Sequence, residues 1–187
     1  FGSEVTFNAS ITSRSTIVFD SNSNKVVIGY RDQGNSNYGT AIVGTVSGTS
    51  ISFGSPTVFE SATVEYLALT FDSNSNKVVI GYGDNGNGGY GTAIVGTVSG
   101  TSISFGSAAV FESANIYYTE AAFDSDTNKV VICYIDEGNS YHGTAVVGTV
   151  SGTSISFGTP VVFQTSQANT YGIIYNTATQ KITIFFR

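Results

Sequence analysis

The sequence predicts an all-β fold in which each repeat contributes four antiparallel strands. Two observations favour this class: a repeat of 52 residues, and short apolar segments separated by turns rich in Gly, Asn and Ser. A third is negative, because no segment keeps the 3.6-residue apolar spacing of an amphipathic helix. A period of this length indicates a supersecondary unit that buries its apolar faces against copies of itself.

Two long motifs define the repeat. The sequence FDSNSNK at residues 19–25 returns unchanged at 71–77 and as FDSDTNK at 123–129, and a diverged copy, YNTATQK, stands at 175–181. A longer motif is identical at 39–55 and 91–107 and returns at 143–159 with two substitutions. We therefore read residues 1–187 as a single repeat domain, with repeats at about 1–52, 53–104 and 105–156 and a partial repeat at 157–187.

Each repeat is expected to fold as four strands. In the second copy these are residues 66–71, 77–82, 92–98 and a fourth strand from 102 towards 111. A polar turn joins the first two strands as a hairpin, and a Gly/Asn loop precedes the third. The only two prolines, Pro56 and Pro160, fall within fourth strands, which suits the edge of a sheet.

The second and third strands are apolar on both faces. Residues 78–82 (VVIGY) and 93–98 (AIVGTV) lack the alternation of a strand with one solvated face. The sheets must therefore be covered on both sides, as in antiparallel sheets stacked around an axis. Four strands and about 50 residues per repeat match the blade of a β-propeller. A β-trefoil or another β architecture is the alternative.

The repeat motifs also resemble a known type of sequence. The pattern Phe-Asp-Ser-x-Ser-Asn-Lys-Val-Val-Ile-x-Tyr, followed by Tyr-Gly-Thr-Ala-Ile-Val-Gly-Thr-Val-Ser-Gly-Thr-Ser-Ile-Ser-Phe, is similar to propeller-type repeats. Such repeats occur in large secreted or surface proteins and in viral and phage fibre-like proteins. The resemblance spans the whole chain and implies an extracellular location, and no catalytic motif is attached to it.

The copies do not fill a whole number of blades. Three complete blades are expected at about 15–59, 67–111 and 119–163. Residues 171–187 supply the first two strands of another blade, and residues 1–7 match the fourth strand at 53–59. We therefore expect the two termini to share a partial blade that lacks its third strand. Self-association or further repeats would complete it, because unpaired strand edges invite association.

Composition argues against several functional classes. The formal net charge is −6 and only 11% of residues are charged, so no basic patch supports nucleic-acid binding. No apolar run approaches the roughly 18 residues of a membrane span. The lone Cys133 is expected in the core, and the lone His142 has no counterpart in the other copies. With no nucleophile motif, metal-ligand cluster or phosphate loop, the protein is not expected to be an enzyme.

One repeated loop resembles the start of a calcium-binding loop. Asp20, Asp72 and Asp124 begin D-x-N-x-N or D-x-D-x-N sequences, which place oxygen ligands at alternate positions. The sixth position holds Lys where the EF-hand pattern has Gly, and no Glu stands at the twelfth. We therefore predict structural turns and no cofactor, with weak calcium binding at these loops as the alternative.

The loop between the second and third strands holds the candidate ligand-binding residues. These are Asp32, Asn35 and Tyr38, with Asp84, Asn87 and Tyr90, and Asp136, Asn139 and Tyr141. A carboxylate, an amide and an aromatic ring together suit a sugar, although the same residues also suit plain turn chemistry. In a propeller this loop shares a face with the connections between blades, where this sequence varies most.

Two functions follow as hypotheses. The first is a non-enzymatic extracellular recognition module that binds glycans or cell-surface polysaccharide weakly through repeated loops and gains strength by multivalency. The second is a structural building block of an extracellular fibre or surface assembly. Near-identical copies suit both, since equal sites aid avidity and equal units aid assembly.

Overall fold

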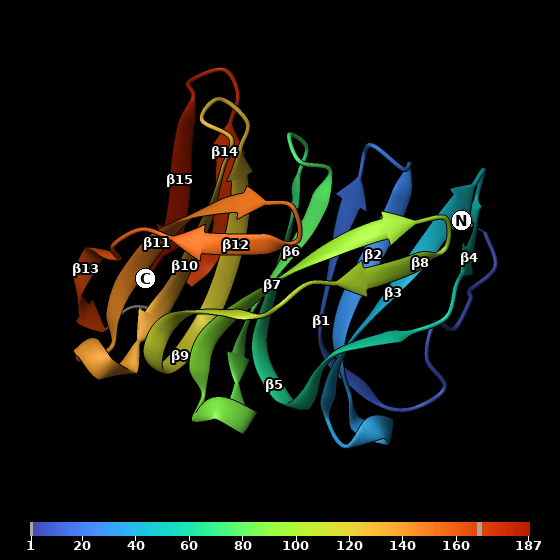
Figure 1. The fold of residues 1–187 in the computed structure, drawn as a ribbon, viewed down its shortest axis with the longest axis horizontal. Helices are drawn as coiled ribbons and strands as arrows, with labels where there is room; N and C mark the ends of the chain where they lie inside the picture. Colours follow the sequence, from blue (N-terminus) through green and yellow to red (C-terminus); the bar gives the residue numbers. More distant parts are fainter. Residues whose placement is uncertain (1, 168–169) are drawn as a thin grey trace.

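The computed structural model describes residues 2–167 and 170–187, and strands dominate these residues (Figure 1). The strands are β1 (Thr12–Asp20), β2 (Lys25–Asp32), β3 (Tyr38–Ser47), β4 (Ser50–Phe53), β5 (Thr57–Asp72), β6 (Lys77–Asp84), β7 (Tyr90–Ser99), β8 (Ser102–Phe105), β9 (Ala109–Asp124), β10 (Lys129–Asp136), β11 (His142–Ser151), β12 (Ser154–Phe157), β13 (Val161–Gln167), β14 (Thr170–Asn176) and β15 (Lys181–Phe186). Three short 3-10 helices, η1 (Gln33–Asn35), η2 (Asn85–Asn87) and η3 (Glu137–Asn139), are the only helices in the described residues. The all-β prediction is confirmed.

All strand pairs are antiparallel, and the strands divide into four successive sheets. The hydrogen-bonded order is β1-β2-β3-β5-β6-β7-β9-β10-β11-β12, with β4, β8 and β13 attached to β3, β7 and β11, and with β14-β15 as a separate pair. We call the first of them sheet A, and it comprises β1 to β4 and the first part of β5. Sheet B comprises the rest of β5, the strands β6 to β8, and the first part of β9. Sheet C comprises the rest of β9 and β10 to β13, and sheet D is β14 with β15.

The connections between sheets are continuous strands, where the sequence suggested variable loops. The first part of β5 pairs with β3 of sheet A, and its second part pairs with β6 of sheet B. Strand β9 joins sheets B and C in the same way. The predicted fourth strand is instead interrupted: β8 ends at Phe105, and β9 begins at Ala109. Pro56 and Pro160 lie in the equivalent gaps of the other copies, where no ladder hydrogen bond is needed.

Successive sheets pack face to face through the same aromatic contact. The ring of Phe59 lies 5.3 Å from Tyr82 and 5.7 Å from Phe105 of the next sheet. The corresponding ring contacts between sheets B and C are Phe111–Tyr134 at 5.2 Å and Phe111–Phe157 at 5.4 Å. In sheet B, residues 78–83 of β6 and 91–96 of β7 are buried without interruption. The prediction that these strands are covered on both faces is confirmed.

The predicted closure of the array by its two termini is wrong. Sheets A, B and C form one continuous hydrogen-bonded array that is open at its ends, and the termini lie near opposite ends of the long axis (Figure 1). The segment before β1 forms no strand in its described part and does not pair with sheet D. Its Phe7 ring lies 5.2 Å from Tyr30 and 5.9 Å from Phe53, both in sheet A. The segment thus packs on the sheet that follows it in the chain, in the same way that Phe59 packs on sheet B and Phe111 packs on sheet C.

The first strands of all four sheets border one open apolar groove of about 490 Å³. Equivalent residues line it, among them Phe19, Phe71, Phe123 and Tyr175. The first strands of the four sheets therefore lie around a common side, and the described strands do not close into a ring.

An acidic residue lies next to the apolar contact between sheets C and D. Glu120 is paired across β9 and β10 with Cys133, which is fully buried in a cluster with Ala122 and Ile173. The predicted core position of Cys133 is thus confirmed, and burial raises the pKa of its thiol to about 12. Burial also raises the pKa of the Glu120 carboxyl above its ordinary value.

Replacing this carboxyl, Glu120→Gln, should raise the melting temperature by a few degrees at neutral pH. Because its pKa is raised on folding, the native state binds this proton more tightly than the unfolded chain does. The carboxyl therefore lowers the free energy of unfolding above its native pKa, and this penalty vanishes as the pH falls below the ordinary value of 4.5. Thermal melts from about pH 4 to 8 should show a gap between variant and wild type that widens with pH. A gap of constant size would refute this role.

Candidate functional site

The three 3-10 helices lie along one edge of the stacked sheets, and the β1–β2, β5–β6, β9–β10 and β14–β15 turns lie at the other (Figure 1). We call the first edge the rim. Each 3-10 helix follows the second strand of its sheet and is capped by the aspartate before it. The capping bonds are Gly34 N to Asp32 Oδ1 at 3.0 Å, Gly86 N to Asp84 Oδ1 at 2.9 Å and Asn139 N to Asp136 Oδ1 at 3.2 Å. These aspartates therefore perform the turn chemistry that was the alternative to ligand binding.

The predicted aromatic partners lie next to these caps in two of the three copies. Tyr38 and Tyr90 begin β3 and β7 directly opposite Asp32 and Asp84, and both rings are half-buried. In the third copy His142 takes the position opposite Asp136.

Tyr141 lies one position earlier, with a φ of 62° and a side chain 37% exposed. Asn35, Asn87 and Asn139 end their 3-10 helices. A ligand role for these loop residues stays a prediction.

A second group of side chains on the rim comes from bulges in the first strands of the sheets. Arg14, Tyr66 and Tyr118 occupy equivalent positions, with φ values of 55°, 52° and 50°. The strand register shifts around each of them. A left-handed backbone is rare for large side chains, and bulges redirect the side chains that they carry. The same unusual geometry in three sheets therefore sets the direction of one arginine and two tyrosines.

The tyrosines of this group form a continuous aromatic cluster across the sheets. The Tyr66 ring centroid lies 5.4 Å from that of Tyr117 and 5.6 Å from that of Tyr118. Tyr117 in turn lies 5.9 Å from Tyr141, on the 3-10 loop of sheet C. At the other end, the Arg14 guanidinium carbon is 4.9 Å above the Tyr66 ring. Tyr118 is 47% exposed, so aromatic surface faces solvent in the middle of the cluster.

Hydrogen bonds fix the end of the cluster at sheet C. Asn115 Nδ2 donates to the Tyr117 hydroxyl at 2.9 Å and to Glu137 Oε2 at 2.8 Å. The Tyr141 hydroxyl donates to Glu137 Oε1 at 2.8 Å. The bonds from Tyr141 and Asn115 lower the pKa of Glu137, which is a charged acceptor at neutral pH.

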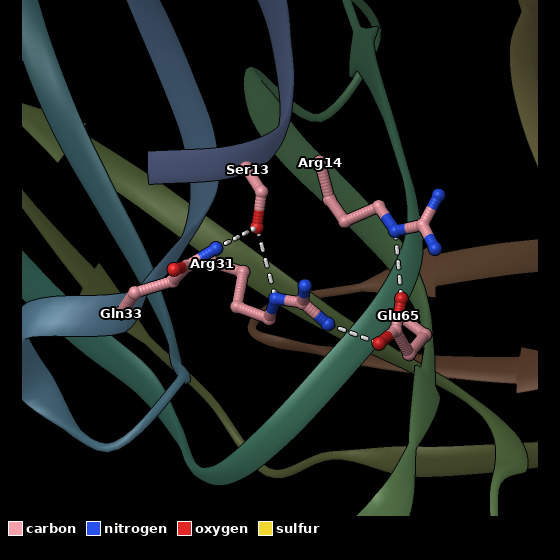
Figure 2. Close-up of polar contacts among 5 residues, drawn as sticks. All are labelled: Ser13, Arg14, Arg31, Gln33 and Glu65. Carbon is pink, nitrogen blue, oxygen red and sulfur yellow. Dashed lines mark hydrogen bonds and ion pairs between the residues drawn. The ribbon is translucent and has the colours of Figure 1, made fainter. Parts of the chain in front are cut away.

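Two arginines share one carboxylate at the end of the cluster on sheet A (Figure 2). Arg14 Nε donates to Glu65 Oε2 at 2.7 Å, and an Arg31 terminal nitrogen donates to Glu65 Oε1. Ser13 Oγ accepts from Arg31 Nε at 3.0 Å and from Gln33 Nε2 at 3.2 Å. These bonds hold residues from β1, β2 and β5 and from η1 in one network.

We call the combined surface the rim strip. It consists of Ser13, Arg14, Arg31, Glu65, Tyr66, Asn115, Tyr117, Tyr118, Glu137 and Tyr141. Of the nine predicted binding residues, Tyr141 alone belongs to it. The connections between sheets, which the sequence marked as the variable part of this face, supply most of the other members. The signal for them was the difference between the copies at residues 63–65 and 115–117, together with the divergence of residues 8–14 from both.

The predicted calcium loops lie at the edge opposite the rim and form closed turns. Asp20 Oδ1 accepts from the backbone N–H groups of Asn22 at 2.9 Å and Ser23 at 3.0 Å, and its Oδ2 accepts from Ser23 Oγ at 2.7 Å. Asp72 and Asp124 repeat the arrangement. Within residues 2–167 and 170–187 no three His, Cys, Asp or Glu side chains gather in a way that could hold a metal ion. The hydrogen bonds fit the predicted structural turns, and weak calcium binding at these loops stays the untested alternative.

Comparison with protein-family models gives no match for this chain, and a search of curated proteins gives no significant one. No helix in the described parts of the chain has the length and apolar character to cross a membrane. What the protein binds must therefore be inferred from its own geometry.

Proposed function

We propose that this protein is a non-enzymatic extracellular recognition module that binds glycans along the rim strip. The observation that carries the proposal is the row of tyrosines, with Tyr118 and Tyr141 47% and 37% exposed, between hydrogen-bonded polar groups at both ends. Aromatic faces stack on the apolar C–H faces of sugar rings, while carboxylate, amide and guanidinium groups bond to hydroxyls. Rigid strands fix both kinds of group before the ligand arrives, which reduces the entropic cost of binding.

The chemistry of the strip suits binding better than catalysis. A glycoside hydrolase needs a carboxylic acid with a raised pKa to protonate the leaving group. In the strip, hydrogen bonds lower the pKa of Glu137, and Glu65 is bound by two arginines. Glu137 therefore does not fit the role of a general acid at neutral pH, and both oxygens of Glu65 already accept hydrogen bonds from arginines.

A glycan array probed with the purified 187-residue chain tests the proposal. We expect retention of a subset of polysaccharides, with stronger binding to polymers than to short oligomers because successive units of a polymer can rebind the strip. Absence of binding to every sugar on the array, with the chain folded by circular dichroism, would end the proposal.

The second candidate is a structural building block that continues its own stack of sheets. Phe7 packs on sheet A as Phe59 packs on sheet B, so the first end of the array carries a segment that belongs structurally to a preceding sheet. At the other end, β15 pairs only with β14 among the described strands, which leaves an edge open to another strand. Repeated units with open ends can extend head to tail. Sedimentation that shows ordered polymers growing with concentration would favour this candidate over recognition.

A further inference from the structure

The rim strip is electrically polarised along its length. The end on sheet A holds two guanidinium groups for one carboxylate, and the end on sheet C holds the Glu137 carboxylate among uncharged donors. Sheet A as a whole carries no surplus charge, because Arg14, Lys25 and Arg31 are balanced by Asp20, Asp32 and Glu60. The cationic group that the strip presents is therefore the 43% exposed side chain of Arg14. A long ligand would therefore meet a cationic group at one end of the tyrosine row and an anionic acceptor at the other.

The two arginines have different surroundings. Arg31 is 18% exposed and is bound to both Ser13 and Glu65. Arg14 is 43% exposed and reaches Glu65 through Nε, while its terminal nitrogens point away from that carboxylate (Figure 2). A guanidinium held by one edge presents its other N–H groups in a fork that matches the two oxygens of a carboxylate or sulfate. Arg31 thus holds Glu65 in place, and Arg14 is the group presented to solvent.

Arg14 also lies within reach of the exposed aromatic surface. Its guanidinium carbon is 4.9 Å from the centre of the Tyr66 ring, which in turn lies 5.6 Å from Tyr118. The Arg14 guanidinium and the Tyr118 ring thus both contact Tyr66, so a sugar stacked on Tyr118 would lie on the same aromatic cluster as the guanidinium. A negatively charged substituent on that sugar or its neighbour could then meet the guanidinium without leaving the strip.

We propose that the rim strip selects acidic glycans, with Arg14 as the group that binds a carboxylate or sulfate substituent. This inference rests on the proposed function and names its ligand class. The stacked tyrosines supply affinity for the sugar rings, and Arg14 supplies the preference for charge. Single-stranded nucleic acid also combines negative charge with stacking, so the test includes it as a competing ligand.

Isothermal titration with matched ligands tests the selection. Oligogalacturonate and its methyl ester differ in charge and by one small methyl group per unit. Dextran sulfate and dextran supply the corresponding sulfate pair, and oligothymidylate serves as the nucleic-acid arm. We expect the charged member of at least one sugar pair to bind about tenfold more tightly than its neutral partner. Arg14→Gln should remove this preference and Arg14→Lys should retain part of it. Lys77→Gln, which makes the same charge change at the opposite edge, should leave the preference intact.

The outcomes separate this inference from the function on which it rests. Equal binding of charged and neutral sugars, unchanged in folded Arg14→Gln protein, would overturn the charge selection and leave glycan recognition standing. Binding of no sugar would overturn both. Tighter binding of oligothymidylate than of any sugar would replace the glycan by a nucleic acid. Melting temperatures of the two Arg14 variants, measured first, ensure that a lost preference is not a lost fold.

Discussion

Replacing Gly106 by Ala should lower the melting temperature by roughly 5–15 °C, a loss of about 2–4 kcal/mol in a chain of this size. A Cβ atom at this position would lie 1.9 Å from the carbonyl oxygen of Thr153, far inside van der Waals contact. Thr153 lies in the turn between β11 and β12 of the next sheet, so the clash would push sheets B and C apart. Gly54 meets Thr101 of sheet B at the same distance of 1.9 Å.

The chain contains its own control for this prediction. Gly158 is the equivalent residue of sheet C, and a Cβ there would meet only the Val147 carbonyl oxygen, at 3.8 Å. Its amide makes the same local bond as that of Gly106, since the two N–H groups donate to Val147 and Val95 at 2.9 and 3.0 Å. Gly158→Ala should therefore change the melting temperature little. Equal losses from Gly106→Ala and Gly158→Ala would mean that the sheets do not stack as described.

The second large effect should come from removing two rings of the rim strip. In Tyr66→Ala/Tyr117→Ala protein, affinity for the best glycan from the array should fall about 10- to 100-fold, because aromatic rings that a ligand covers carry much of the energy of a binding site. Titration calorimetry on the wild type and the double variant measures the loss.

Two controls accompany this variant. Tyr66→Phe/Tyr117→Phe keeps both stacking faces and should bind within a few-fold of wild type. Tyr175→Ala removes a half-buried tyrosine beside the turns at the opposite edge and should not alter binding. Wild-type affinity in the folded double alanine variant would show that the rim strip does not bind the glycan.

Much of the fold could be predicted because the same pattern of apolar segments and polar turns occurs in each repeat. The doubly apolar strands at 78–82 and 93–98 required sheets covered on both faces, and the structure has them. The predicted closure by the termini is wrong because residues 1–7 match residues 53–59, a segment that both pairs within its own sheet and packs on the next sheet. In sheet A, Phe59 lies on β5, which pairs with β3, but its ring packs on sheet B. Sequence identity could not tell which role the isolated copy keeps, and it keeps the packing.

The proposed rim strip lies on the face that the sequence indicated, but most of its residues differ from those that the sequence predicted. The side-chain oxygens of Asp32, Asp84 and Asp136 suggest a ligand role, but an aspartate before a tight turn accepts the N–H groups of that turn first. The bulges could not be foreseen, since neither arginine nor tyrosine signals a left-handed backbone as glycine or asparagine does. The Arg31–Glu65 pair joins residues 34 positions apart and depends on how the sheets pack.

Chemical-shift mapping with the best glycan from the array shows directly whether the rim strip binds the ligand. We expect amide signals of residues 13–14, 65–66, 115–118 and 137–141 to shift on titration, and those of residues 20–24, 72–76 and 124–128 at the opposite edge to stay unchanged. Shifts confined to the opposite edge, or spread evenly over the chain, would contradict the assignment of the rim strip as the glycan-binding surface.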